Sequence, residues 1–315
     1  MVFQQALALL GRHFELLLLL YWGLATFAST VALLPVPWTS RFRAAVQLSA
    51  CRGKLMDLRP ATRALGPLSD WTVPQAWFSH FYALGATWNA AVAWMLFAPG
   101  SAPLPEGQRA SVALVLALLQ VHLCRRWAET VGPLTYPPGA RMHGIAYVFG
   151  MSYYFLVSLS VLPPATYPAL TAQAAQRLSL PAQPRLSHPG WVLERVSWLQ
   201  LAGAAVFLLG NALQCHSHWL LARLGRRGGS RAKQAYKIPR GGAFELVSCP
   251  HYLGEVVIYA GLALVAGGGR RATAWLMLLW VVTNLSLAAG MTHRWYREHF
   301  KSYPRRRRAL FPFVF

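Results

Sequence analysis

The residues of this chain best suited to chemistry lie in its final third, in the stretch Phe244–Glu255 (FELVSCPHYLGE). An apolar helix is predicted to follow at once, so Glu255 is expected inside a membrane span. An ionisable residue at that depth costs roughly 2.5–3.5 kcal/mol, and such residues usually face a partner or a water-filled cavity. His251, Glu255 and Tyr259 stand four residues apart, which places them on one helical face. This polar face predicts a functional site.

The preceding apolar segment carries a second polar face, formed by Asn211, Gln214 and His218. Such residues often only join helices within a membrane. This face, however, runs into a group of arginines, namely Arg223, Arg226 and Arg227. The planar fork of arginine suits phosphate recognition, and the glycines of the following loop allow close backbone approach to a ligand. The two features predict a cleft for an anionic nucleotide. No G-x-G-x-x-G or Walker sequence is present, so a Rossmann or P-loop site is not expected.

Composition indicates the class of protein that must position these faces. The chain is 55% hydrophobic and 12% charged, with a net charge of +21. A soluble domain carries about twice that charged fraction. The apolar residues form blocks near the ~20 residues that a bilayer span requires, and helices satisfy their own backbone hydrogen bonds in lipid. We therefore expect an all-α, multi-pass membrane protein, a seven-transmembrane helical bundle. The expected spans are about 14–34, 77–98, 111–127, 142–163, 196–221, 246–268 and 272–291.

The basic residues predict the orientation of the bundle. With seven spans, 23 of the 30 lysines and arginines fall on one side and the remainder on the other. Arg125 and Arg126 are expected at the edge of a loop on the basic side. Because cytosolic loops are enriched in basic residues, the C-terminus is predicted to be cytosolic. Residues 35–76 are expected to form a basic loop, and the proline-rich residues 163–190 an extended linker without a fold of its own.

The same composition argues against several other classes. The positive charge is explained by membrane insertion and anionic lipid, and no nucleic-acid module is recognisable, so nucleic acid is not an expected partner. The four cysteines are far apart and include no C-x-x-C pair, so neither a metal site nor a disulfide framework is expected. Nothing in the sequence indicates an obligate protein partner.

Three motifs resemble the steroid 5-alpha-reductase family, and within it most closely the polyprenol reductase branch. They are K-I-P-R-G-G-x-F-E-L-V-S-x-P-H-Y-L-G-E at 237–255, H-R-W-Y at 293–296, and S-Y-P-R-x-R-x-A-L-x-P-F-x-F at 302–315. Weaker matches occur at 77–82 (WFSHFY), at Arg125-Arg126-x-x-Glu129 and at 153–157 (YYFLV). The resemblance covers residues 77–98, 120–162 and 205–315.

The resemblance implies one membrane-embedded domain over 1–315, located in the endoplasmic reticulum membrane, whose catalytic and NADPH-binding part spans about 196–315. It implies cofactor contacts at Gln214, His218, Tyr236, Lys237, His251, Glu255, His293 and Tyr296, with Arg126 and Arg226 or Arg227 near the phosphates. The chain also departs from the steroid enzymes. Gln214 and His251 replace Asn, His218 replaces Asp, and His80-Phe81 replaces a Gln-Glu pair. These departures favour a polyisoprenoid lipid over a steroid as substrate.

The implied reaction is NADPH-dependent reduction of the double bond in the alpha-isoprene unit of polyprenol or polyprenal, in dolichol biosynthesis for protein glycosylation. An unsaturated aldehyde accepts a hydride more readily than an allylic alcohol, because charge then develops on its oxygen. We therefore expect polyprenal as the immediate substrate. The candidate catalytic residues are Glu255, which would orient the nicotinamide, His80 and Tyr82, which would meet the oxygen, and Tyr296.

Three alternatives remain at this point. The sequence Pro250–Glu255 also resembles the motif of isoprenylcysteine carboxyl methyltransferases, although those enzymes have His-Pro rather than Pro-His. A 3-oxo-steroid 5-alpha-reductase would use the same cofactor on another substrate. A non-enzymatic seven-span receptor or a transporter is the third alternative.

Overall fold

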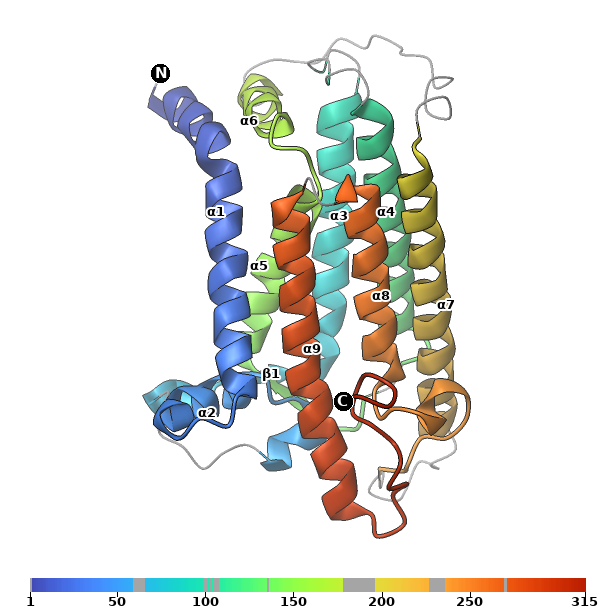
Figure 1. Ribbon diagram of the computed structural model, residues 1–315. Coiled ribbons are helices and arrows are strands. Elements are labelled where there is room, and N and C mark those ends of the chain that lie inside the picture. The colour runs from blue at the N-terminus through green and yellow to red at the C-terminus, as the bar shows by residue number, and fades with distance from the viewer. Residues whose placement is uncertain are drawn as a thin grey trace.

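The part of the chain that the structure describes is a bundle of long helices with two very short strands (Figure 1). The computed structural model describes residues 2–58, 66–98, 101, 104, 108–134, 136–177, 196–226, 236–268 and 271–315. Its α-helices are α1 (Val2–Leu33), α2 (Ser40–Ser49), α3 (Phe78–Phe97), α4 (Arg109–Val131), α5 (Gly144–Ser160), α6 (Thr166–Arg177), α7 (Trp198–Arg226), α8 (Pro250–Val265) and α9 (Ala272–His299). Strands β1 (Thr72–Pro74) and β2 (Arg141–His143) pair antiparallel, with Val73 opposite Met142.

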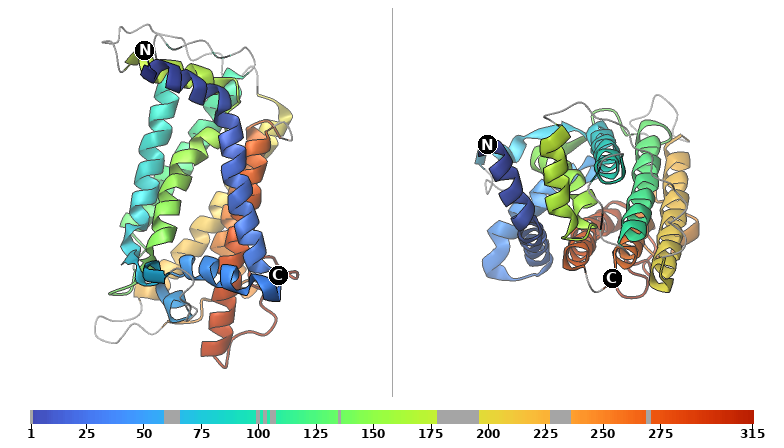
Figure 2. Two further views of the ribbon diagram at one scale, coloured as in Figure 1. Left: turned by 90° about the vertical axis from the view of Figure 1, so that its left-hand side faces the viewer. Right: turned by 90° about the horizontal axis from the view of Figure 1, so that it is seen from above.

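The long helices run side by side, with α1 and α7 on opposite flanks of the bundle (Figures 1 and 2). The N-terminus lies at one end, whereas α2, the two strands and the C-terminal segment gather at the other. Buried side chains join the helices. For example, Trp22 of α1 is fully buried and its indole Nε1 donates to Ser160 Oγ of α5 at 2.9 Å. The cytosolic end predicted from the basic loops corresponds to the end that holds α2 and the C-terminal segment.

Each of the seven spans expected from the sequence coincides with one helix, namely α1, α3, α4, α5, α7, α8 and α9. Of the described helices, four are long and apolar enough to cross a membrane: α1 from Leu9, α4, α7 to Gly225, and α9. The apolar helices α5 and α8 are shorter, with 17 and 16 residues. Length and composition thus support a membrane protein with four candidate spans, and the predicted count of seven is not confirmed.

Three local predictions were wrong. Residues 35–76 contain α2, β1 and short 3-10 helices rather than only a loop. Residues 166–177 of the predicted linker form α6, which packs against α1 so closely that a Cβ on Gly11 would lie 2.5 Å from Thr171 Oγ1. The rest of that prediction, 178–190, lies outside the described residues. Helix α9 continues to His299, so the H-R-W-Y motif occupies its last turns instead of following it.

Helices α7 and α8 approach each other through glycine. A Cβ on Gly261 would lie 2.5 Å from the backbone nitrogen of Phe207, and one on Gly210 would lie 2.6 Å from that of Ile258. Small residues allow helix backbones to come this close within a membrane. The close approach matters for function, because a Cβ on Gly254 would meet Gln214, a residue of the predicted polar face, at 2.9 Å.

We expect Gly261→Ala to destabilise the protein, because the new methyl group would push α8 away from the α7 backbone. Overpacking of this kind costs about 1–3 kcal/mol. The measurement is thermal unfolding of the detergent-purified protein, with Gly23→Ala in α1 as the matched control, since nothing lies within 4 Å of a Cβ there. Equal melting temperatures for the two variants would show that the close contact is not needed.

Candidate functional site

A cavity of about 560 Å³ opens among the helices, and residues of α2 and β2 contribute to its lining. Residues of α1, α3, α4, α5, α7, α8 and α9 line it, together with Arg52 from the segment after α2. The cavity receives six of the residues singled out from the sequence: Tyr82, Arg126, Gln214, His218, His251 and Glu255. Residues distant in the chain are thus brought to a single site.

Glu255 is held by polar groups of α4 and α7. Its side chain is 14% exposed. The Gln214 amide donates from Nε2 to Glu255 Oε2, and also to the carbonyl oxygen of His251 at 3.2 Å. His122 Nε2 lies 3.4 Å from Glu255 Oε1. The carboxylate therefore has a neighbour at each oxygen and does not point into lipid.

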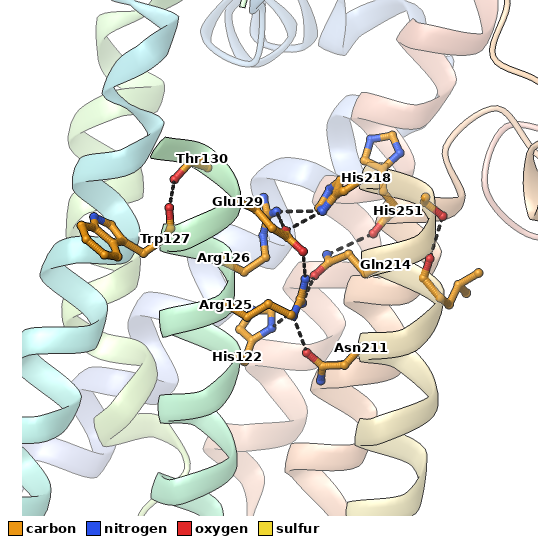
Figure 3. A network of polar contacts seen from close by, with 12 residues as sticks. His122, Arg125, Arg126, Trp127, Glu129, Thr130, Asn211, Gln214, His218 and His251 are labelled. Atoms are coloured by element: carbon orange, nitrogen blue, oxygen red, sulfur yellow. Dashed lines mark hydrogen bonds and ion pairs between the residues drawn. The ribbon is translucent and has the colours of Figure 1, made fainter. Parts of the chain in front are cut away.

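Arg126 is fixed between two acceptors. It donates from Nε and Nη2 to the Tyr82 hydroxyl at 3.2 and 2.8 Å, and from Nη1 to Glu129 Oε2. His218 Nδ1 lies 2.8 Å from both Glu129 Oε2 and Arg126 Nη1 (Figure 3). Since one nitrogen either donates or accepts, the carboxylate and the guanidinium compete for it. These contacts hold the Arg126 guanidinium at the surface of the cavity, where it forms a cationic wall.

His251 and Arg52 complete the polar part of the cavity. The Nδ1 atom of His251 is buried and has no hydrogen-bond partner among the described residues. The imidazole ring lies 4.2 Å from the Tyr252 ring, and the Tyr252 hydroxyl accepts from Arg52 Nη2 at 2.6 Å. Arg52 is held by a backbone bridge to Met142 of β2. A buried imidazole nitrogen without a partner and two arginines form a surface suited to a polar, anionic ligand.

The rest of the cavity is mainly apolar. Small side chains of α1 face bulky ones of α5 and α9 there, and the lining includes Ala25, Ala28, Phe149, Trp280 and Leu285. The cavity therefore has a polar part between α4, α7 and α8 and an apolar part between α1, α5 and α9. Such a division suits a ligand with a polar head and an apolar tail.

A second cluster holds two other predicted residues, Tyr236 and Tyr296, and His293 contacts it through the ring of Tyr303. None of the three lines the cavity. Lys54 Nζ lies 3.4 Å from the centroid of the Tyr296 ring, and burial lowers the pKa of Lys54 to about 7. His293 Nδ1 is 2.7 Å from Ser248 Oγ. The C-terminal motifs thus build a compact aromatic cluster beside α9.

The remaining predicted residues lie elsewhere. His80 is exposed, and its Nδ1 is 3.1 Å from the Tyr147 hydroxyl rather than in the cavity. Lys237 is exposed. Arg226 is the last residue of α7, and Arg227 lies outside the described residues. The position of His80 outside the cavity gives no geometric support for catalysis by this residue.

Sequence reasoning missed His122, Arg52 and the roles of Arg125 and Glu129. Arg125 and Arg126 were expected at a loop edge, but α4 continues to Val131 and Arg126 is only 7% exposed. The spacing of Arg125, Arg126 and Glu129 was the available signal, because residues three and four apart pair on a helix. Arg52 gave no signal, since it is positioned by an isolated backbone bridge to Met142 that the sequence does not reveal.

These features define a class, a helical membrane bundle with an internal site that joins a cationic wall to an apolar chamber. Comparisons with known proteins agree. Residues 188–315 match the family model described as 3-oxo-5-alpha-steroid 4-dehydrogenase. Polyprenal reductase 1 of Arabidopsis thaliana is 34% identical over 93% of this chain and 95% of its own length. Polyprenal reductase of Xenopus tropicalis is 32% identical over 77% of this chain and 80% of its own length.

The chain belongs to the polyprenal reductases, a branch of the steroid 5-alpha-reductase family. The resemblance inferred from its motifs is thereby confirmed. Membership makes the protein an oxidoreductase.

Proposed function

We propose that the protein uses NADPH to reduce the alpha-isoprene double bond of a polyprenal. The observation that carries the proposal is the divided cavity, in which Tyr82, Arg126 and Glu255 line one part and apolar side chains line the other. The relatives named polyprenal reductases support the substrate class. Dolichol supply for protein glycosylation is the corresponding biological role.

The residues present fit a phosphorylated dinucleotide. Arg52 and Arg126 line the cavity as cations, and His251 offers a buried ring nitrogen that has no other partner among the described residues. Gln214 and Glu255 provide an amide and a carboxylate for a carboxamide such as that of nicotinamide. When bound, NADPH supplies the hydride. The chain's own groups bind it, orient it and limit the access of water.

The substrate aldehyde requires a donor for its oxygen. In the proposed reaction a hydride adds to the beta carbon, a proton adds to the alpha carbon, and negative charge develops on the carbonyl oxygen in between. Tyr82 is the best-placed donor, because it lines the cavity and its oxygen already accepts two hydrogen bonds from Arg126. Donors aimed at developing charge stabilise the transition state. The apolar part of the cavity would hold the first isoprene units, and the remaining tail would extend into lipid.

We further propose a seven-span arrangement in the endoplasmic reticulum membrane with the C-terminus in the cytosol. The basic residues of the loops support it, since 23 of the 30 fall on one side of the membrane when the chain is threaded through seven spans. Cytosolic NADPH would then reach the cationic wall directly. Glycosylation-site insertion at each loop measures this topology, and modification of a C-terminal site would contradict it.

The decisive assay uses purified protein in lipid nanodiscs, with NADPH and either polyprenal or polyprenol. With polyprenal we expect NADPH to be oxidised and dolichal to form. With polyprenol we expect neither. Equal turnover of the alcohol would reject the aldehyde preference. Reduction of a 3-oxo-4-ene steroid in place of polyprenal, or binding of S-adenosylmethionine without binding of NADPH, would reject the proposed function itself.

A further inference from the structure

Arg125 lies beside the cavity without lining it, and it contacts four polar residues at once (Figure 3). Its Nε donates to Asn211 Oδ1 at 2.9 Å, and its Nη1 to Glu129 Oε1 at 2.5 Å. Its Nη2 donates to Gln214 Oε1 at 2.5 Å and lies 3.3 Å from His122 Nδ1. One guanidinium thus connects α4 to α7.

The contact with Gln214 fixes the direction of that amide. A carboxamide has an acceptor end and a donor end, whereas a guanidinium has donors only. The oxygen of Gln214 must therefore face Arg125. The nitrogen is left to face Glu255, to which it donates.

The contact with His122 fixes the tautomer of that ring in the same way. A neutral imidazole has one donor nitrogen and one acceptor nitrogen. Because Arg125 can only donate, Nδ1 of His122 accepts and the proton lies on Nε2. That nitrogen is the one 3.4 Å from Glu255 Oε1, a contact that falls short of hydrogen-bond geometry. The His122 side chain is fully buried, and Nε2 has no other partner among the described residues, so Glu255 is the acceptor within its reach.

We infer that Arg125 is a positioning residue that turns both donors, the amide of Gln214 and the imidazole of His122, toward the two oxygens of Glu255. The inference deepens the proposed function, since it explains how the carboxylate in the cofactor-binding part of the cavity is oriented. Glu129, on the same helix, pairs with Arg125 through Oε1 and with Arg126 through Oε2. The two neighbouring arginines thus have different roles. Arg125 orients Glu255 from behind the cavity, whereas Arg126 lines the cavity itself.

Infrared difference spectroscopy tests this orientation without any reaction. The Glu255 carboxylate bands are isolated by subtracting the spectrum of Glu255→Gln from that of its parent, which is practicable in a chain with nine acidic residues. Arg125→Lys keeps the charge beside Glu129, but one ammonium cannot make all four contacts. We expect its carboxylate bands to shift, whereas those of Arg41→Lys, an exposed arginine on α2, should coincide with the parent.

If Arg125→Lys does not fold, Arg125→Met serves as the second variant. Methionine carries no charge, so no unpaired cation is buried at position 125. Unshifted bands in a folded variant at position 125 would overturn the inference, whether or not the protein reduces polyprenal. An inactive wild-type protein with shifted bands would instead reject the proposed function and leave the positioning role standing.

Turnover provides a second, independent readout. Small misplacements of reacting groups cost about 10²-fold in rate. We expect Arg125→Lys to lower turnover by about 10–100-fold, and by less than about twofold when Glu255→Gln is already present, because residues that act through one another are not additive. A full additional loss in the double variant would mean that Arg125 does not act through Glu255.

Discussion

Glu255→Gln is expected to weaken NADPH binding by roughly 10–100-fold. A hydrogen bond to a charged group contributes about 1.5–3 kcal/mol, and each 1.4 kcal/mol changes an equilibrium constant tenfold. The substitution removes the charge and places two amides against each other at Gln214. The measurement is the NADPH dissociation constant by fluorescence titration, with turnover of polyprenal measured in parallel. An active variant with unchanged affinity would remove Glu255 from the site.

A control variant in which the amide and the carboxylate exchange positions separates the effect of the charge at position 255 from the effect of the hydrogen bond between α7 and α8. In the double variant Gln214→Glu with Glu255→Gln, an amide and a carboxylate again face each other, and the new carboxylate can accept from Arg125. The pairing of α7 with α8 is retained while the charge moves to α7. We expect the double variant to be as stable to thermal unfolding as the wild-type protein, and its NADPH affinity to remain low. Recovery of affinity would mean that the position of the charge is unimportant.

The sequence predicted most of the polar part of the cavity. Helical periodicity placed Gln214 and His218 on one face and His251 and Glu255 on another. A carboxylate in an apolar segment needs polar partners, so the polar faces of neighbouring helices are expected to meet around it. The structure indeed brings all four to one cavity.

Other parts could not be read from the sequence, because they depend on which helices are neighbours. Arg52 reaches the cavity through a bridge between two segments about ninety residues apart. His122 lies in a helix whose apolar pattern says nothing about which neighbour it faces, yet its ring meets Glu255 of α8. His80 and Tyr82 are two residues apart on one helix, so they point in different directions. The sequence alone did not indicate which of them faces inward.

Tyr82→Phe is expected to lower the turnover of polyprenal by about 10²–10³-fold, the loss that follows removal of one donor to a developing oxyanion. Little change is expected in the NADPH dissociation constant, since Arg126 retains Glu129 as a partner. The phenyl ring conserves the packing against Tyr154, whose ring centroid is 5.0 Å away. The measurement is single-turnover reduction of polyprenal, which reports the chemical step alone.

His80→Phe is the matched control on the same helix. His80 was an equal candidate for the donor on sequence grounds, but it is exposed and contacts Tyr147 outside the cavity. Its substitution should leave turnover within about twofold, as is usual for surface changes away from a site. The opposite ranking, a slow His80→Phe and an active Tyr82→Phe, would require the aldehyde to bind outside the cavity, on the face of α3 that carries His80. The two variants therefore decide both the identity of the donor and the side of α3 on which reduction takes place.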